Sequence, residues 1–292
     1  MQLRLDLPDS PVQRQSDVED SLALQVTLDT RPLLKWPGGK REILKTILPL
    51  VPRTFNRYYE PFLGGGALFF ALQPPESILS DSNAELVNCY IQVRDHPDDV
   101  IAHLRRLKNT EEDYYRIRSD MPLDEVGCAA RLIYLTTLSF NGIYRLNAHG
   151  RFNVPYGHKA HLVPADSERI RVAGTALSSA RFTCDDFENA VEGATAGDLV
   201  YLDPPYTVAH GSNGFLKYNA KIFSWEDQVR LAKVATALVQ RGCRVIVTNA
   251  DHTSILDLYK GFSRRRVQRF SRIAASSAFR RRTTECIFYV EV

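Results

Sequence analysis

Short apolar runs alternate with amphipathic stretches along most of the chain, and the apolar runs end in polar loops. Four of them end at Gly, Pro, Asp or Asn: residues 58–62 before three glycines, 77–80 before Asp81, 199–202 before Asp203 and 244–248 before Asn249. This alternation is typical of a parallel sheet covered by helices. Because ligands of such sheets bind at the carboxyl ends of the strands, the pattern predicts an α/β fold with a site among these loops.

One helix that covers the sheet is marked at both ends. Ser224 followed by Asp227 is typical of a capping box. Apolar residues then recur at helical spacing over residues 229–239, and Gly242 is typical of the residue that ends a helix.

A different pattern occupies the middle of the chain. Helical periodicity without a convincing strand covers residues 84–95, 97–108, 111–119 and 124–139. We interpret this part as a helical insertion, which continues into a loop at 141–158 rich in Asn, Arg, Gly and aromatic residues.

Composition and cysteine content exclude several classes of protein. With 292 residues, 44% apolar and 24% charged, the chain can bury a sizeable core. It has no apolar run of roughly 18 residues, so we expect a soluble, cytoplasmic protein without a membrane span. The five cysteines are far apart and form no CxxC pair, and the seven histidines show no metal-ligand spacing, so neither a disulfide framework nor a metal site is expected.

The net charge of +3 hides two opposed segments. Residues 1–30 carry six acidic and two basic side chains, whereas the remaining 262 residues carry 35 basic and 28 acidic ones. We interpret residues 1–30 as a flexible acidic leader and place the start of the folded domain near Arg31.

The segment Asp203-Pro204-Pro205-Tyr206 carries the strongest chemical signal. It follows a predicted strand, so a carboxylate and a proline-fixed carbonyl stand side by side as two hydrogen-bond acceptors. Two acceptors beside an aromatic face suit the exocyclic amine of a planar nucleobase. The alternative is a rigid turn in which Asp203 caps a helix and Tyr206 packs in the core.

Two further segments suit phosphate or nucleoside ligands. Gly64-Gly65-Gly66 between a strand and a helix, with Asp81 at the next strand end, indicates an adenosine-containing cofactor, although GxGxxG is missing and a purely structural turn is the alternative. The segment 35–40, Lys-Trp-Pro-Gly-Gly-Lys, is by itself equally consistent with a turn, a phosphate cradle or a surface patch.

These three segments, followed by residues 141–147 (NGIYRLN) and 150–157 (GRFNVPYG), together resemble the Dam-type, alpha-group DNA adenine-N6 methyltransferases over residues 33–292. The resemblance implies a Rossmann-like sheet that binds S-adenosylmethionine (SAM), formed by residues 31–83 and 176–292. It also implies a helical target-recognition domain at 84–175.

The resemblance further implies which residues hold the cofactor. Asp81 would contact its ribose, Asp186 its 6-amino group and Phe187 its adenine ring, although Asp186 is also consistent with a surface turn. The full set implied for SAM is Trp36, Lys40, Phe62, Gly64, Gly66, Asp81, Asp186, Phe187 and Asp203.

The implied reaction is direct methyl transfer to an adenine flipped out of the duplex. Asp203 and Pro204 would hold the amine, Pro205 would keep the turn rigid and Tyr206 would stack on the base. No cysteine follows a proline, so the covalent chemistry of cytosine-C5 enzymes is not expected.

Double-stranded DNA is the implied partner, and the family's corresponding residues read GATC. The residues implied or inferred to contact DNA are Lys35, Phe140, Asn141, Ile143, Arg145, Asn153, Pro155, Arg280, Arg281 and Arg282. The last three end a run of arginines from residue 264 that is also consistent with a solvated face. Methylation of an RNA adenine or a protein glutamine, a catalytically silent DNA-binding module and a partnership with a cognate restriction endonuclease all stay open.

Overall fold

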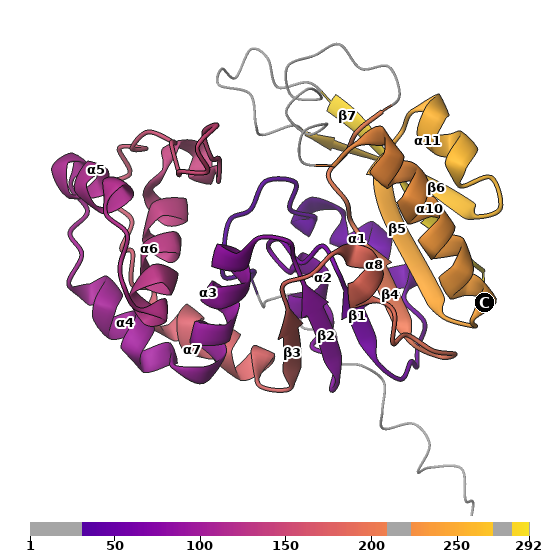
Figure 1. The fold of residues 1–292 in the computed structure, drawn as a ribbon, viewed down its shortest axis with the longest axis horizontal. Helices are drawn as coiled ribbons and strands as arrows, with labels where there is room; N and C mark the ends of the chain where they lie inside the picture. Colours follow the sequence, from indigo (N-terminus) through magenta and orange to yellow (C-terminus); the bar gives the residue numbers. More distant parts are fainter. Residues whose placement is uncertain (1–30, 209–222, 271–281, 292) are drawn as a thin grey trace, which may run out of the picture.

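The computed structural model describes residues 31–208, 223–270 and 282–291, which form a seven-stranded sheet with helices on both faces (Figure 1). The strand order is β3-β2-β1-β4-β5-β7-β6. The first five strands are parallel, and β7 is antiparallel to both neighbours. The strands are β1 (Tyr58–Glu60), β2 (Ser77–Ser80), β3 (Ala180–Thr183), β4 (Leu199–Leu202), β5 (Arg244–Ala250), β6 (Ser263–Phe270) and β7 (Arg282–Tyr289). The α/β class expected from the sequence is confirmed.

The predicted strands differ from the observed ones mainly at their ends. β2 and β4 coincide with residues 77–80 and 199–202, whereas β5 continues to Ala250. β1 ends at Glu60 instead of residue 62, because Pro61 has no N–H group to continue the ladder.

The order of the strands reverses at β1, and this creates the crevice in which a ligand can bind. β1 pairs with β2 on one side and with β4 on the other. The glycine turn at 64–66 follows β1, and Asp203 follows β4. The two segments therefore meet at the topological switch point of the sheet.

The hairpin of β6 and β7 is a feature that the sequence pattern does not predict. Arginines at 264, 265, 266 and 269 interrupt the apolar alternation of β6. Its partner β7 supplies the buried side chains, with Ile287 in one apolar cluster and Phe288 in the other. The first three arginines of the basic run are thus exposed residues of an edge strand.

Two apolar clusters lie on opposite faces of the sheet. Tyr201 of β4 belongs to the cluster that also contains apolar residues of segments 33–72 and 86–177. Leu202 belongs to the cluster that contains apolar residues of α10 (Trp225–Gln240). Complete burial of such side chains contributes about 1.5–3 kcal/mol each. The helices of the sheet domain are η1 (Arg41–Ile43), α1 (Leu44–Ile47), η2 (Leu48–Leu50), α2 (Ala67–Leu72), α8 (Phe187–Ala190), α10 (Trp225–Gln240) and α11 (Thr253–Leu258).

The capping box predicted for the covering helix is present. Ser224 Oγ accepts a hydrogen bond from the backbone N–H of Asp227 at 3.1 Å, and the Asp227 carboxylate accepts one from the N–H of Ser224 at 2.9 Å. This reciprocal pair satisfies two donors at the start of α10.

The helical region lies beside the β3 edge of the sheet (Figure 1). Its helices are α3 (Ala84–Asp95), α4 (Pro97–Arg105), α5 (Glu111–Ser119), α6 (Glu125–Leu138) and α7 (Ser167–Leu177). The first four agree with the predicted segments except that α4 and α6 are shorter, whereas α7 is a helix that the sequence analysis does not predict. The 141–158 loop joins α6 to α7 and begins within the short η3 turn (Phe140–Gly142).

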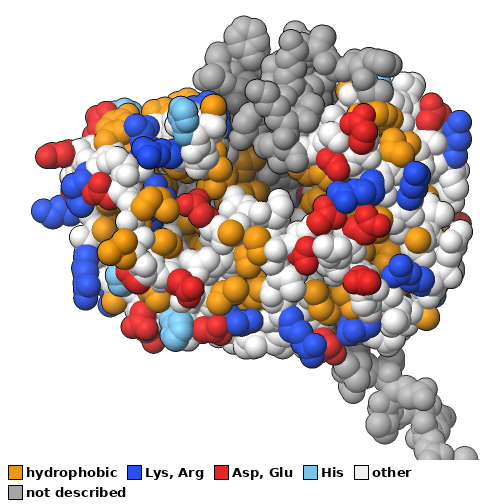
Figure 2. Space-filling model, in the orientation of Figure 1, with side chains coloured by type: hydrophobic (Ala, Val, Ile, Leu, Met, Phe, Trp, Pro, Cys, Tyr) orange, Lys and Arg blue, Asp and Glu red, His pale blue; other side chains and the backbone are white. Residues whose placement is uncertain are grey.

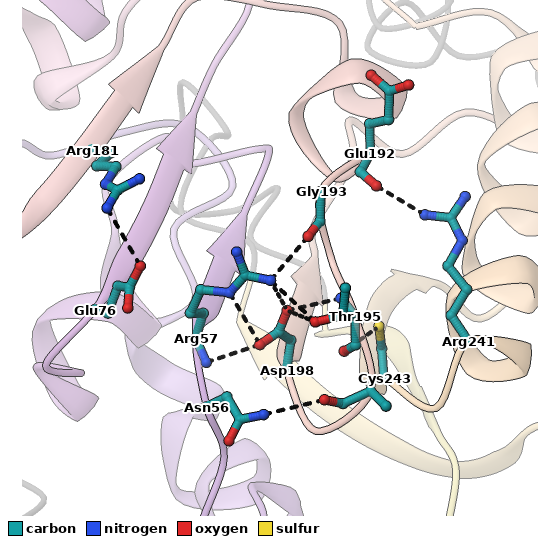
Figure 3. A network of polar contacts seen from close by, with 11 residues as sticks. Asn56, Arg57, Glu76, Arg181, Glu192, Gly193, Thr195, Asp198, Arg241 and Cys243 are labelled. Carbon is teal, nitrogen blue, oxygen red and sulfur yellow. Dashed lines mark hydrogen bonds and ion pairs between the residues drawn. The ribbon is translucent and has the colours of Figure 1, made fainter.

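A polar network fixes the opposite, amino-terminal ends of β1 and β4 (Figure 3). Arg57 donates from its backbone N–H and its guanidinium to the buried carboxylate of Asp198, at 3.0 and 2.8 Å. Burial raises the pKa of Asp198, but the hydrogen bonds from Arg57 and Thr195 outweigh burial and the pKa lies below its ordinary value. The network aligns the two strands whose other ends form the candidate site.

Candidate active site

The carboxylate of Asp203 lies at the carboxyl end of β4, among buried side chains of other segments. Its Oδ1 is 2.7 Å from Lys40 Nζ and accepts a hydrogen bond from Thr248 Oγ1 at 2.6 Å. The side chains of Lys40 and Asp203 are 5% and 16% exposed, so the pair is largely shielded from water. Asp203 caps none of the described helices, and this disfavours the purely structural alternative.

The turn after Asp203 is held from two sides. The carbonyl oxygen of Pro205 accepts a hydrogen bond from Gln228 Nε2 at 3.0 Å, and Asn249 Nδ2 in turn donates to Gln228 Oε1 at 2.8 Å. Gln228 and Asn249 are fully buried, and Pro204 is also buried. These contacts fix the turn that contains the carbonyl group of Pro204, which the sequence predicts to act as an acceptor.

Tyr206 is anchored through its hydroxyl group. The hydroxyl donates to Glu285 Oε2 of β7 at 2.9 Å, and Lys40 Nζ lies 4.8 Å from the centre of the ring. Burial, together with the carboxylates of Asp203 and Glu285, raises the pKa of Tyr206 well above its ordinary value. The ring is therefore a neutral, oriented face beside the Asp203 carboxylate.

A second carboxyl group is buried next to this site. Glu60 ends β1, is 2% exposed and accepts a hydrogen bond from the Tyr58 hydroxyl at 2.8 Å. Burial raises the pKa of Glu60 to about 8; the hydrogen bond from Tyr58 opposes the shift, and the charge of Asp203 adds to it.

The glycine turn after β1 brings the backbone close to other segments. Gly64 has φ of +48°, and a Cβ atom there would lie 2.9 Å from Trp36 Cδ1. Gly66 has φ of +62° as the N-cap of α2. The backbone conformation at both positions favours glycine. At residue 64 there is also no room for a Cβ atom beside Trp36.

Asp81 holds this turn in place. One oxygen of its carboxylate accepts a hydrogen bond from the N–H of Gly64 at 3.0 Å, and the other accepts one from the N–H of Asn83 at 3.0 Å. Burial raises the pKa of Asp81 despite these hydrogen bonds. Because each carboxylate oxygen can accept more than one hydrogen bond, Asp81 keeps acceptor capacity for a ligand hydroxyl.

The segment 35–40, whose role the sequence leaves open, connects the sheet edge to the 141–158 loop. Lys40 reaches Asp203, whereas Trp36 stacks on Tyr144 with ring centres 4.5 Å apart. Lys35 is exposed and packs its stem against Gly142, where a Cβ atom would lie 2.5 Å from Lys35 Cδ.

Asp186 and Phe187 lie at the start of α8, which follows β3. Phe187 is buried and stacks on Phe62 with ring centres 5.4 Å apart, so two of the predicted cofactor residues meet. Asp186 caps α8 and forms a salt bridge with Arg230 at 2.7 Å, and the same guanidinium lies 4.4 Å from the centre of the Phe187 ring. Asp186 therefore has a structural partner that the sequence pattern does not reveal.

The residues expected to contact DNA in the 141–158 loop are more exposed. Phe140, just before the loop, is 39% exposed, and Asn141 has φ of +54°. Arg145 is exposed and its Nε donates to Asn153 Oδ1 at 2.8 Å. Pro155 is exposed and accepts a backbone hydrogen bond from Phe140, and Ile143 is half-buried.

The expected arginine contacts can be located only in part. Arg280 and Arg281 lie outside the described residues, whereas Arg282 begins β7, paired with Phe270. The last residue pair between β5 and β7 is Ala250 with Glu285. Arg282 lies beyond it, where only β6 and β7 are paired, at the carboxyl end of the parallel strands. Lys, Arg, Asp and Glu are interspersed over the face seen in Figure 2, which is hollowed between the helical region and the sheet.

Several residues of the site are absent from the sequence-based prediction. From distant parts of the chain, predicted site residues are contacted by Thr248, Gln228, Glu285 and Arg230. Tyr201 contacts Thr248 in turn. A polar residue in an otherwise apolar strand, such as Thr248 in β5, is a signal that could have marked one of them, but it does not apply to Gln228 and Arg230, which lie on α10. In the part of the chain that the structure describes, no group of three His, Cys, Asp or Glu could hold a metal ion, and no helix is long and apolar enough to cross a membrane.

Comparisons with known proteins agree on one family. The family model described as D12 class N6 adenine-specific DNA methyltransferase matches residues 36–273. Type II methyltransferase M1.LlaDCHI of Lactococcus lactis subsp. cremoris is 39% identical over 270 residues, which span 89% of this chain and 95% of that protein. Type II methyltransferase M.MjaIII of Methanocaldococcus jannaschii is 34% identical, spanning 82% and 91%. The DNA adenine methylase of Escherichia coli strain K12 is 32% identical, spanning 76% and 81%.

Proposed function

The chain belongs to the D12 class of N6 adenine-specific DNA methyltransferases, and we propose that it flips adenine out of duplex GATC and methylates N6 directly from SAM. Adenine-specific DNA methylation follows from the family itself. Base flipping, the GATC site and the roles of individual residues are the proposal, and the contacts around Asp203 support them.

The residues around the glycine turn fit the methyl donor that the family implies. The turn brings the backbone closer than a side chain at residue 64 would allow, Asp81 offers acceptors suited to ribose hydroxyls, and Phe62 and Phe187 offer an aromatic surface. Trp36, Lys40, Gly66 and Asp186 complete the set that would hold it. SAM supplies an electrophilic methyl group on a sulfonium.

The single observation that carries the proposed chemistry is the arrangement at Asp203. Lys40 and Thr248 both contact Oδ1, and among the described residues no hydrogen bond reaches Oδ2. Oδ2 and the carbonyl oxygen of Pro204 then remain as acceptors for the two hydrogens of adenine N6. Hydrogen bonds to both hydrogens favour a nitrogen with a localised lone pair, which is a better nucleophile.

The Asp203 carboxylate can also take the proton that N6 loses when it is methylated. Oδ2 of Asp203 would hold that proton before its release to water, while Lys40 provides the neighbouring positive charge. Pro205 keeps the turn rigid, and the anchored ring of Tyr206 supplies the face on which the flipped base stacks. Adenine must leave the helix because its N6 is paired in the duplex.

Exposed side chains of the 141–158 loop support sequence reading in the major groove. Arg145 carries a guanidinium that can donate two hydrogen bonds to guanine, and Asn153 orients it from within the same loop. Asn141 and Lys35 can donate to base edges, Ile143 and Pro155 can contact a thymine methyl group, and Phe140 can fill space in the stack. Arg280, Arg281 and Arg282 would contact phosphates, so that affinity falls with salt.

The names of two similar proteins support a partner for this chain. Both are called Type II methyltransferases, and we include in the proposal that this chain protects DNA against a cognate restriction endonuclease. RNA adenine and protein glutamine stay alternatives to be tested as substrates, and the family description favours neither.

One experiment tests both the reaction and its site. Unmethylated genomic DNA is incubated with SAM and the purified protein and then sequenced for N6-methyladenine in context. We expect modification at GATC. Modification at another motif would contradict the recognition site alone, whereas unmodified DNA despite normal SAM binding would favour the catalytically silent module.

A further inference from the structure

Two buried hydroxyl groups form a hydrogen-bonded chain that ends at Asp203. Tyr201 of β4 and Thr248 of β5 are 1% and 0% exposed, and their hydroxyl oxygens are 3.2 Å apart. Thr248 Oγ1 is 2.6 Å from Asp203 Oδ1. β4 and β5 are adjacent parallel strands, so the hydrogen bonds run from Tyr201 on β4 to Thr248 on β5 and back to Asp203, which follows β4.

The direction of these hydrogen bonds follows from the number of protons. A threonine hydroxyl has one hydrogen, and a carboxylate oxygen can only accept. Thr248 therefore donates to Asp203, and its oxygen is left to accept the hydrogen of Tyr201. Each group in the chain orients the next, and the carboxylate stands at its end.

Resting on the proposed function of Asp203, we propose that Thr248, oriented by Tyr201, is a positioning residue that turns the Asp203 carboxylate so that Oδ2 faces the target amine. Thr248 occupies Oδ1 and directs the other oxygen to the substrate side. It acts through Asp203 and touches neither substrate.

Thr248 is better suited than Lys40 to fix the angle of the carboxylate. A threonine has a short β-branched side chain with restricted χ1, and here it stands on a central strand. Lys40 has a long flexible stem and divides its donors between Asp203 Oδ1 and the carbonyl oxygen of Gly38, each at 2.7 Å. Lys40 therefore provides the positive charge next to Asp203, and Thr248 fixes the orientation of the Asp203 carboxylate.

A purely structural role for Thr248 makes a different prediction. A buried hydroxyl that only satisfies its own hydrogen bonds affects the free energy of unfolding when removed, but not the rate of transfer. Thr136 in α6 offers this comparison, because it is 1% exposed and its hydroxyl donates to the carbonyl oxygen of Leu132 at 2.8 Å. Thr136→Val is therefore the matched control.

The test is the single-turnover rate of methyl transfer to a duplex at saturating SAM and DNA, measured with SAM affinity by calorimetry. Thr248→Val keeps the shape but not the donor, and we expect a rate about 10- to 100-fold lower, with the affinity for SAM within twofold of wild type. Thr248→Ser, which restores the hydroxyl, should recover the rate to within threefold. Tyr201→Phe should slow transfer about threefold to tenfold, and Thr136→Val should leave it unchanged.

Several outcomes would overturn the proposal. The proposal is wrong if Thr248→Val folds and its transfer rate is within twofold of wild type. It is also wrong if the transfer rate of Thr248→Ser is as low as that of Thr248→Val. If Thr248→Val does not fold, Thr248→Ser and Tyr201→Phe decide, because unchanged transfer in Tyr201→Phe contradicts the hydrogen-bonded chain. A failure of the proposed function is distinguishable, since Asp203→Asn would then transfer normally or wild type would leave adenine unmodified.

Discussion

The carboxyl edge of the sheet and the 141–158 loop hold their polar side chains in opposite ways. At the sheet edge Lys40, Thr248 and Glu60 are buried. Lys40 and Thr248 contact Asp203 from other segments of the chain, and Glu60 accepts a hydrogen bond from Tyr58 of its own strand. In and beside the loop, Phe140 is 39% exposed and Arg145 is bonded only to its loop neighbour Asn153 among the described residues.

This difference suits the two regions to different tasks, methyl transfer at the sheet edge and recognition of the DNA sequence in the loop. Transfer needs acceptors that are fixed before the substrate arrives, because reorganising them would raise the barrier. Reading a base edge needs donors that can leave water and adapt to the groove. Substitutions at the sheet edge should therefore change stability and rate, whereas substitutions in the loop should change the choice of sequence.

The largest effect on stability is expected from breaking the buried ion pair. Lys40→Met leaves the Asp203 carboxylate without its cation, and we expect a loss of about 3–5 kcal/mol in the free energy of unfolding. The control is Arg116→Met, which breaks an exposed pair with Asp113 and should cost much less, because water already solvates both charges. Urea unfolding measures both. Equal losses would remove the distinction between the two regions.

A pH dependence is expected from Glu60. Its pKa is about 8 in the folded chain against an ordinary 4.5. Below about pH 4.5 Glu60 is protonated in both the folded and the unfolded chain, so its burial does not lower the stability there. As the pH rises toward 8 the unfolded chain ionises first, and stability falls by at most about 1.4 kcal/mol per pH unit.

Glu60→Gln cannot ionise and keeps an acceptor for the Tyr58 hydroxyl. Urea unfolding between pH 5 and 8.5 should therefore show a flatter decline for the variant than for wild type. Identical slopes would mean that Glu60 ionises normally in the folded protein.

A pair of glycines compares the two regions directly. Gly64 and Gly150 both have positive φ, so alanine strains either by ~1 kcal/mol, but only at Gly64 does the new Cβ meet another side chain, Trp36 at 2.9 Å. We expect Gly64→Ala to weaken SAM binding at least about tenfold by displacing Trp36 and the turn. Gly150→Ala, with no atom within 4 Å, should bind SAM within twofold of wild type in calorimetry. Similar losses in both would show that backbone strain alone governs binding.

The sequence predicts those features of the sheet's carboxyl edge that depend on local signals, but not the contacts between segments that are distant in the chain. Strand ends and glycines are local signals, so β2, β4, the glycine turn and Asp203 are placed correctly by pattern alone. Thr248 and Glu285 become site neighbours only through strand pairing, which the local pattern does not contain. The hairpin of β6 and β7 is missed for a related reason, since the arginines of β6 hide a strand whose apolar support comes from β7.

A smaller and more selective effect is expected from the loop. Arg145→Ala should lower the preference for the cognate site over a site with one guanine replaced by about 1–3 kcal/mol. The maximal transfer rate at saturating DNA should stay within threefold of wild type. Competition between the two duplexes measures this preference, and an unchanged ratio would assign the reading of that guanine to another residue.

The central claim is that Asp203 prepares the amine of adenine for direct transfer. The most direct measurement is the single-turnover rate of Asp203→Asn on a GATC duplex, with SAM affinity determined on the same preparation. We predict a rate lower by about a thousandfold with SAM affinity within threefold of wild type, because the amide keeps the shape but replaces one acceptor with a donor. A rate within tenfold of wild type, with adenine N6 still the methylated atom, would contradict the claim.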